Sequence, residues 1–346
     1  MKLNVKELKA FKQKSAFIKK NNVLPILDFL KFENGTVTKS ALHEFIIQDI
    51  KCSETFLVDE NILMNFIDRC DSDEVTVKVD GNKVILSDKK TKVISPTEDV
   101  SHFPVHEITI ENPFTFDIHH LEAMQIASEF VAATEDAAGY VHVGGPNIMA
   151  SDRIIAFMKS FNDDFPKIIL RKSEIVAISK FDEIVFTENE KYHYFATDGL
   201  KCGFLKAADI PFFDMSKLLE YSKELPKTLF DKSDFVKFND LCLSCSPQKF
   251  PTATMTPNKR NIDLTLQDTQ YERTISTQIL AENKDQFKPF MFLISYMNRL
   301  LKSIPNGPIG LYRGPVCFFL TGDGDFTALI MEYTGPVISS ETTQTN

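Results

Sequence analysis

Residues 54–86 read ETFLVDENILMNFIDRCDSDEVTVKVDGNKVIL, and this stretch contains the unit from which the fold is predicted. The apolar run 54–58 predicts a short strand, and the apolar residues of 59–69 recur at i, i+1, i+4 and i+5, which is one face of a helix. Runs 74–79 and 83–86 alternate like strands, and the Asp-Gly-Asn between them is a strong hairpin signal. The stretch therefore predicts a strand, a helix and an antiparallel hairpin.

The same order of elements occurs three times along the chain. The starts of the three segments are separated by about 110 to 120 residues, which is the size of one typical domain. The strands that follow each helix favour antiparallel pairing, because parallel strands would need crossover helices. The second and third copies comprise the runs 167–170, 172–180, 183–186, 192–196, 289–293, 295–302, 309–312, 316–320 and 327–331.

The other half of each unit opens with a further helix, at 5–20, 118–132 and 233–243. The predicted fold is therefore α+β, with three repeated domains that each pack two helices on antiparallel sheets. Pro-containing breaks at 101–105, 209–214 and 222–226 separate the repeats. We place the domains at 1–107, 108–222 and 223–346, the last with a polar C-terminal tail.

Composition limits the class of protein. The 346 residues are 43% hydrophobic and 25% charged, which favours a globular protein of two or three domains. No apolar run approaches the roughly 18 residues that span a bilayer, and the lysine-rich start lacks the apolar core of a signal peptide. We therefore expect a cytoplasmic protein without a membrane partner. Cys242 and Cys245 form a lone CxxC, which we interpret as buried free thiols.

Several short motifs resemble those of the DNA polymerase III beta sliding clamp family of bacteria, in order along essentially the whole chain. Arg153-Ile154-Ile155 stands where the family has Gly-His-Arg-Leu, and Glu332 stands where it has Pro, so the resemblance is to a divergent member, of bacterial or phage origin. The matching motifs are Leu24-Pro-Ile-Leu27 with the turn Asn34-Gly35, Phe103-Pro104, Ala150-Ser151-Asp152, Ser295-Tyr296 and Leu329-Ile-Met331.

The resemblance implies a ring that closes head to tail as a homodimer around double-stranded DNA. Such a protein is a non-catalytic processivity factor that binds DNA independently of sequence, binds the replicative polymerase and a clamp loader, and needs no cofactor. By the same resemblance, Val93 and Leu243 lie near the dimer seam. The net charge of −9 fits this function if cations gather on the inner surface, because phosphate affinity depends on local Lys and Arg placement.

Lysines of the first helix are the main candidates for DNA contact. They lie opposite its apolar face, where lysines are usually just solvated, but in a clamp such helices line the central hole and meet phosphates without reading bases. The helix 59–69 is largely acidic, so the lining is not uniformly basic. The predicted DNA-binding residues are Lys9, Lys12, Lys19, Lys20, Tyr140, Arg171, Lys172, Lys180, Lys232, Lys237, Arg299 and Lys302.

The family also has a pocket for a short partner peptide between its second and third domains. Met and Tyr suit such a groove, since the thioether adapts its shape and the phenol joins an apolar ring to a polar tip. Taken alone, Ile155 or Leu329 is equally well explained by core packing. Position by position, the resemblance places the pocket at Ser151, Ile154, Ile155, Pro211, Tyr296, Pro315, Leu329, Met331 and Tyr333.

The sequence gives little support to catalysis or metal binding. His119 and His120 are adjacent, so on a helix they point about 100° apart and cannot share a metal ion. The Walker, GxSxG and HExxH motifs do not occur. Two alternatives stay open: a clamp-fold protein that binds peptides as a monomer without encircling DNA, and an unrecognised α+β enzyme. Native mass separates the first of these from a ring.

Overall fold

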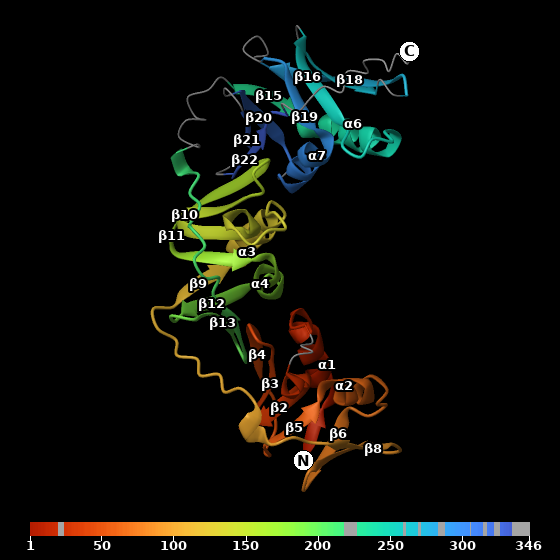
Figure 1. Cartoon of the computed structure of the whole chain (residues 1–346), viewed down its shortest axis with the longest axis vertical. Coiled ribbons are helices and arrows are strands. Elements are labelled where there is room, and N and C mark those ends of the chain that lie inside the picture. The colour runs from red at the N-terminus through yellow and green to blue at the C-terminus, as the bar shows by residue number, and fades with distance from the viewer. Residues whose placement is uncertain are drawn as a thin grey trace, which may run out of the picture. The chain divides into compact units, whose positions relative to one another are not determined.

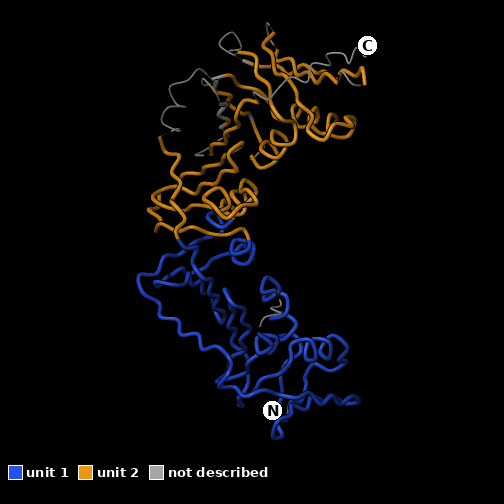
Figure 2. The backbone as a smooth tube through the Cα atoms, viewed as in Figure 1, with its two compact units in different colours: residues 1–121, 173–208 blue, residues 122–172, 209–346 orange. Residues whose placement is uncertain are grey.

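The computed structural model describes residues 1–19, 24–217, 227–258, 261–268, 271–282, 288–304, 306–313, 317–321 and 326–333. The chain forms two compact units, residues 1–121 with 173–208 and residues 122–172 with 209–346 (Figure 2). Each unit takes part of the predicted middle domain, and the three-domain division stays a prediction. The strands pair antiparallel, and helices pack on the sheets, which confirms the predicted α+β class.

The first unit contains an eight-stranded and a four-stranded sheet (Figure 1). In the larger sheet, β4 (Glu44–Asp49) pairs with β14 (Leu200–Leu205), which joins the first and second predicted domains. Its other strands, in spatial order, are β5 (Phe56–Asp59), β2 (Phe29–Glu33) and β3 (Thr36–Ser40) before β4, and β13 (Tyr192–Thr197), β12 (Glu183–Glu188) and β9 (Phe114–Asp117) after β14. The smaller sheet has the order β1 (Lys2–Asn4), β6 (Glu74–Asp80), β7 (Lys83–Ser87) and β8 (Lys92–Pro96).

Several helices begin directly after a strand because an Asn or Asp side chain caps the start of the helix. Asn4 accepts hydrogen bonds from the N–H groups of Lys6 and Glu7, at 2.8 and 3.2 Å, where α1 (Val5–Lys14) begins. Asp59 accepts one from Ile62 N–H at 3.0 Å where α2 (Glu60–Asp68) begins. Such caps satisfy N–H groups that have no partner inside the helix, so the chain can pass from strand to helix without a loop.

The turn residues confirm the predicted hairpins. Asn34 and Gly35 have φ values of 49° and 80°, as the two central residues of a type I′ turn require. Gly81, in the Asp-Gly-Asn turn between β6 and β7, has φ 59°. Both turns therefore set the register of the strands that they connect.

The second unit is built on a ten-stranded sheet. Its strand β11 (Ile155–Arg171) pairs with β10 (Tyr140–Ser151) on one side and with β22 (Phe326–Met331) on the other, which joins the second and third predicted domains. The remaining strands follow in the order β21 (Cys317–Thr321), β20 (Pro308–Arg313), β15 (Lys227–Asp231), β18 (Arg273–Glu282), β17 (Asn261–Asp268), β16 (Thr252–Asn258) and β19 (Phe290–Leu293).

The helices α6 (Lys232–Cys245) and α7 (Ile294–Ser303) lie side by side in the second unit (Figure 1). Lys232, the first residue of α6, is 7% exposed. Its ammonium donates hydrogen bonds to the carbonyl oxygens of Leu301, at 3.2 Å, and of Ile304. The end of a helix leaves carbonyl groups without intrahelical partners, and Lys232 supplies partners for two of them at the end of α7.

Three helices end earlier than their apolar periodicity predicts. α1 ends at Lys14 and is followed by a single 3-10 turn, Ser15–Phe17; α3 (Ile118–Ser128) and α4 (Lys172–Ile178) end before 132 and 180. The hydroxyl of Ser128 donates to the carbonyl of Gln125 at 2.7 Å, and that of Ser15 to the carbonyl of Lys12 at 3.4 Å. Such local side-chain bonds compete with the helical hydrogen-bond ladder, which accounts for the early ends of α1 and α3.

Candidate functional site

Two strand pairs join the predicted domains, and both follow one rule. β4 pairs with β14 through residues 44–48 and 200–204, and β11 pairs with β22 through residues 155–159 and 326–330. In each case, the strand at the edge of a domain's first half pairs with the last strand of the following domain. The rule produces two junctions within one chain.

A third pair of strands, β8 and β18, occupies equivalent positions in the repeat, but the two strands do not pair with each other within the chain. The hairpin pairs Ser40↔Phe45, Ser151↔Ala156 and Asp268↔Arg273 are equivalent, so β18 occupies in the third domain the place of β4 and the start of β11. Over residues 273–280, β18 pairs with β17, and it meets β15 only at 281–282. β8, the last strand of the first domain, pairs with β7 and forms an edge of its sheet. Among the described residues, β8 thus has an open edge along the strand, and β18 has one over residues 273–280.

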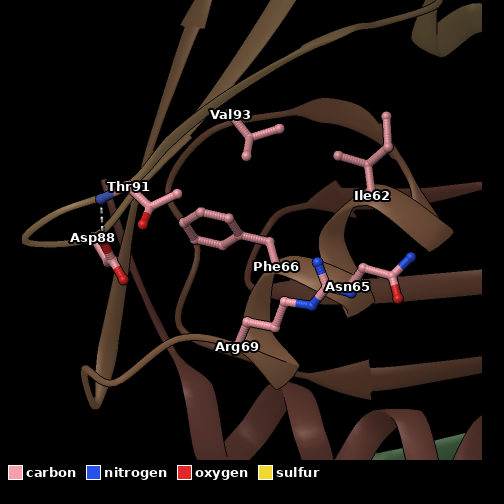
Figure 3. A pocket seen from close by; sticks show the side chains of 7 residues that line it. All are labelled: Ile62, Asn65, Phe66, Arg69, Asp88, Thr91 and Val93. Carbon is pink, nitrogen blue, oxygen red and sulfur yellow. Dashed lines mark hydrogen bonds between the residues drawn. The ribbon is translucent and has the colours of Figure 1, made fainter.

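Beside β8, the first unit has a hollow of about 320 Å³ that the sequence did not predict (Figure 3). Phe66 lies between Val93 and Arg69, and Asp88 lies at the rim (Figure 3). The N–H groups of Lys90 and Thr91 donate to the Asp88 carboxylate at 2.8 and 2.6 Å and hold its pKa below the ordinary value. The hollow is lined by Ile62, Asn65, Phe66, Arg69, Asp88, Thr91 and Val93, the last of which is a predicted seam residue.

The predicted DNA-binding lysines of the first helix face outward. Lys9, Lys12 and Lys19 are exposed, and Lys20 lies outside the described residues. Lys12 forms an ion pair of 2.5 Å with Asp68 of α2. Just beyond α4, Lys180 donates to the carbonyl oxygen of Gln13 at 3.5 Å, so it lies next to the end of α1. Exposed ion pairs of this kind contribute little energy, so Lys12 remains free to exchange its partner for a phosphate.

The remaining predicted DNA-binding residues are spread over the second unit and its surface. Arg171 lies over the ring of Tyr140, with 5.9 Å from Cζ to the ring centroid, which brings these two together. The lysines of this group form surface ion pairs: Lys172 with Glu129 at 2.8 Å, Lys237 with Asp234 at 3.0 Å and Lys302 with Asp240 at 2.6 Å.

Two predicted DNA-binding cations are engaged elsewhere. The ammonium of Lys232 points into the protein, against the end of α7. The position of Lys232 on its helix did not predict this burial. Arg299, on α7, pairs with Asp152, whose side chain is 7% exposed, and lies over Tyr296 with 5.0 Å from Cζ to the ring centroid. We therefore leave Lys232 and Arg299 out of the proposed DNA surface.

Asp152 brings the predicted pocket residues of the two domains together. Its Oδ1 accepts hydrogen bonds from the N–H groups of Ile154 and Ile155, at 2.9 and 2.8 Å, and so shapes the turn between β10 and β11. Its Oδ2 pairs with Arg299. Arg153 has a φ of 78° in this turn, where the family motif has Gly. One carboxylate therefore couples the turn of the second domain to α7 of the third.

Several predicted pocket residues meet at this turn. The N–H of Met331 donates to the carbonyl of Ile154 at 2.8 Å, and the N–H of Tyr333 donates to that of Met291 at 2.9 Å. The Ser151 hydroxyl donates to the carbonyl of Ile155 at 3.1 Å. Ile155 is fully buried in the core, so Ile154 and the 38% exposed Met331 present the apolar surface here. Pro211 is exposed, and Pro315 lies outside the described residues.

A buried cluster next to these residues was not predicted. We call it the methionine cluster: Met149, Ala156, Met158, Met215 and Leu329. Phe212 and Phe213 of the linker segment, defined as residues 211–215, pack against it, as does Tyr312. Only Leu329 was identified from the sequence, because the members come from β10, β11, the linker segment and β22, and no spacing along the chain relates them.

We expect Arg299→Met to lower the free energy of unfolding by about 2–4 kcal/mol, because it leaves a buried carboxylate without its cation. The change is measured as a loss of stability in urea unfolding. The double variant Asp152→Asn, Arg299→Met should recover most of this loss, since Asn retains an oxygen that can accept from Ile154 and Ile155 N–H but carries no charge. Equal stability of the single and double variants would contradict the pairing.

Within the described part of the chain, no group of three or more His, Cys, Asp or Glu side chains is placed to hold a metal ion, and no helix is long and apolar enough to cross a membrane. Cys242 and Cys245 are free thiols. Burial raises the pKa of Cys242 to about 12, whereas Cys245 is exposed, so the expectation of two buried thiols is right for Cys242 only.

No family model and no curated protein matches the sequence. Solved structures match over almost its full length. The beta subunit of the DNA polymerase of Streptococcus pyogenes is 15% identical with a TM-score of 0.83, covering 96% of this chain and 99% of that one. A DNA polymerase sliding clamp from Caulobacter crescentus is 14% identical with a TM-score of 0.82, covering 97% and 100%.

A third match is the sliding clamp of Pseudomonas aeruginosa bound to griselimycin, at 14% identity and a TM-score of 0.84, covering 96% of this chain and 98% of that one. These matches span the two compact units, and they agree with the motifs that carry the resemblance in the sequence. The chain has the fold of the DNA polymerase III beta sliding clamps.

Proposed function

We propose that the protein is a DNA sliding clamp, a non-catalytic processivity factor that closes as a head-to-tail homodimer around duplex DNA. The observation that carries this proposal is the third, unjoined strand pair. β4 and β11 have the same place in their domains as β18, and β14 and β22 have the same place as β8. These equivalent strands pair twice within the chain, as β4·β14 and β11·β22. If β18 of one copy pairs with β8 of the next, the same contact is repeated head to tail, and it closes a ring when its rotation closes.

Surface chemistry at the two open edges supports this pairing. Most residues of β18 between 273 and 278 are exposed, Leu280 on the same strand is 78% exposed, and Ile94 on β8 is 55% exposed. A long edge strand with apolar side chains is a template for pairing with another chain. In a ring, each edge would be covered by the other.

The helices beside the proposed seam are complementary as well. At the β4·β14 junction, the segment after α4 lies next to α1 through Lys180 and Gln13. The same arrangement at the third junction places α2 of one copy beside α6 of the next. α2 carries part of the hollow that Val93 lines, and α6 carries the exposed side chains Leu241 and Leu243. Apolar side chains of α6 can thus fill a hollow that is open in the single chain.

Inside such a ring, exposed lysines of α1 and of the second unit would contact phosphates. Phosphate contacts carry no sequence information and are weakened by salt, so a ring held by them can slide. The net charge of −9 keeps the rest of the surface acidic, which disfavours binding of DNA elsewhere. The persistence on DNA then comes from enclosure and needs no high affinity.

The pocket at the Asp152 turn would take a short peptide of the replicative polymerase, of the clamp loader or of another partner. It would combine half-exposed Met331 and Ile154 with the ring of Tyr296, and by the resemblance with that of Tyr333. Two buried apolar anchors contribute about 1.5–3 kcal/mol each, and ordering the peptide offsets part of that energy, so the expected affinity is micromolar.

The decisive experiment measures retention on nicked circular DNA after loading by the cognate loader, before and after the circle is linearised. A ring stays on the circle and slides off the linear form. The alternative, a monomeric peptide-binding adaptor of the same fold, predicts a monomer in light scattering and equal, salt-sensitive binding to both forms. Equal retention on the two forms would exclude encirclement.

We expect Lys9, Lys12 and Lys19 together changed to Ala to lower retention on the circle. The log–log dependence of affinity on salt should flatten by about 0.9 for each phosphate that the variant no longer neutralises. Stability should barely change, because the three side chains are exposed. A matched control changes Lys51, Lys78 and Lys191 to Ala, which removes the same charge from exposed positions outside α1 and outside the proposed seam strands. An unchanged salt slope in the α1 variant would show that this helix does not line the hole.

A further inference from the structure

His142, on β10, is fully buried and holds two hydrogen bonds that define its tautomer. Its Nε2 lies 2.8 Å from the carbonyl oxygen of Ala137, which can only accept, so Nε2 carries the proton. Its Nδ1 accepts a hydrogen bond of 3.2 Å from the backbone N–H of Phe213. The imidazole is therefore neutral, and it connects β10 to the linker segment.

The linker segment is also fitted to β10 by shape. The rings of Phe212 and Phe213 meet the imidazole of His142 edge to face, with centroids 5.5 and 5.9 Å away. Phe212 lies over Gly144, where a Cβ atom would come within 2.8 Å of its ring. Lys167 of β11 also contacts Phe212, with its Nζ 5.6 Å from the centroid of the ring. His142 and Gly144 thus both face the Phe212 ring of the linker segment.

The same segment forms part of the proposed partner pocket. Phe212 and Phe213 pack against the methionine cluster, and Met215 belongs to it. The N–H of Met215 donates to the sulfur of Met149 at 3.5 Å. Pro211, a predicted pocket residue, is at the start of the segment. The position of the linker segment in the pocket therefore depends on the contacts that hold Phe212 and Phe213 to β10.

We propose that neutral His142 is a positioning residue of the partner pocket: it holds the linker segment on the methionine cluster, and protonation of the imidazole releases it. A protonated Nδ1 becomes a donor and faces the Phe213 N–H, which is also a donor, so the hydrogen bond is replaced by repulsion. Peptide affinity should then fall in acid. Only the effect on peptide affinity rests on the proposed function, since the hydrogen bond between His142 and the linker segment is independent of it.

Burial holds the pKa of His142 below its ordinary value of 6.5, while the hydrogen bond to Ala137 opposes this. The charged groups on the surrounding elements are Asp136 before Ala137, Lys167 and Arg171 on β11, and Asp209 and Asp214 around the linker segment. Hydrogen bonds from Ala138 N–H and from Ser216 hold the pKa values of Asp136 and Asp214 below 3.8, so both stay ionised while His142 titrates. The segment is thus held fully above pH 6.5 and is released as pH falls through the lower pKa of the folded protein.

The experiment compares hydrogen exchange of the full chain at about pH 7.5 and about pH 5, corrected for intrinsic exchange rates, in the peptide that covers 209–217. The parent should lose about tenfold protection in acid, the equivalent of one hydrogen bond. His142→Asn should keep protection at both pH values, because Asn Oδ1 can accept from Phe213 N–H and does not titrate. His142→Phe should be unprotected at both, since its ring packs but accepts nothing.

Gly144→Ala gives a second route to the same state, because its Cβ displaces the Phe212 ring without changing any titratable group. It should expose the linker segment at both pH values, and the unfolding temperature of each variant checks that the rest of the fold is intact. The proposal is overturned if His142→Asn loses protection in acid as the parent does, or if His142→Phe stays protected.

Binding of a fluorescein-labelled peptide, the last twelve residues of the source organism's replicative polymerase, tests the final step. Its affinity should follow the exchange results, about tenfold weaker in acid for the parent and independent of pH for His142→Asn. Exchange that behaves as expected without any peptide binding would leave His142 as the anchor of the segment and count against the pocket.

Discussion

Replacing Leu243 by Asp should convert the dimer to a monomer and abolish retention on circular DNA. Leu243 is 38% exposed on α6 of the single chain, so the folded monomer tolerates a carboxylate there. In the proposed ring, the same position faces the hollow lined by Val93 and Phe66 of the next copy. An unpaired charge buried at that contact costs about 3 kcal/mol or more, which weakens the dimer at least about a hundredfold.

Native mass measured over a range of concentrations gives the dissociation constant, and the circular DNA assay gives the functional consequence. Leu42→Asp is the matched control: Leu42 is 44% exposed but lies between β3 and β4, far along the chain from either open edge. The control should stay dimeric and stay on DNA. If Leu243→Asp also stayed dimeric, the seam would not involve α6, and the continuation of β18 onto β8 would have to be abandoned.

Replacing Met331 by Asp should abolish binding of the polymerase peptide while the ring and its retention on DNA persist. Met331 is 38% exposed at the end of β22, and its N–H is bonded to Ile154, so its side chain lies where the two domains meet. A peptide anchor that buries this position would bury the new carboxylate without a partner. The expected loss is about 3 kcal/mol, or about a hundredfold in affinity.

Fluorescence anisotropy of the labelled peptide measures this effect, and Met331→Leu is the matched control because it keeps the volume and apolar character of the side chain. The control should bind within about threefold of the parent. Peptide binding by Met331→Asp at the parental affinity would place the partner site elsewhere. Leu243→Asp and Met331→Asp should each remove one function and leave the other, so the ring and the pocket can be assigned separately.

Much of the fold could be predicted because its signals are local. The Asn34-Gly35 turn, the Asp-Gly-Asn turn and the apolar spacing of α2 depend on residues within one turn or one hairpin of each other. Repetition extended these signals to the whole chain, since each segment repeats the same order of strand and helix. The ends of α1 and α3 were wrong because single hydroxyl groups, of Ser15 and Ser128, compete with the helix ladder.

The candidate site was predicted in part. The resemblance brought Ser151, Ile154, Met331 and Tyr333 to one place, and the structure joins the first three at the Asp152 turn, whereas Tyr333 is bonded to Met291. It gave no signal for the methionine cluster or for His142, which has no neighbour in sequence that suggests a contact with Phe213, 71 residues away.

The sequence by itself determined the class of fold, the hairpins and the helix starts. It also determined the net charge of −9, against which a DNA-binding surface needs a local cluster of cations. Tertiary structure alone decided which cations remain at the surface. Lys232 and Lys237 are on one helix and look alike in sequence. The ammonium of Lys232 nevertheless donates to two carbonyl groups at the end of α7, whereas Lys237 is 76% exposed. The reason is physical: a buried carbonyl group must find a donor, and which lysine lies within reach depends on how two distant helices pack.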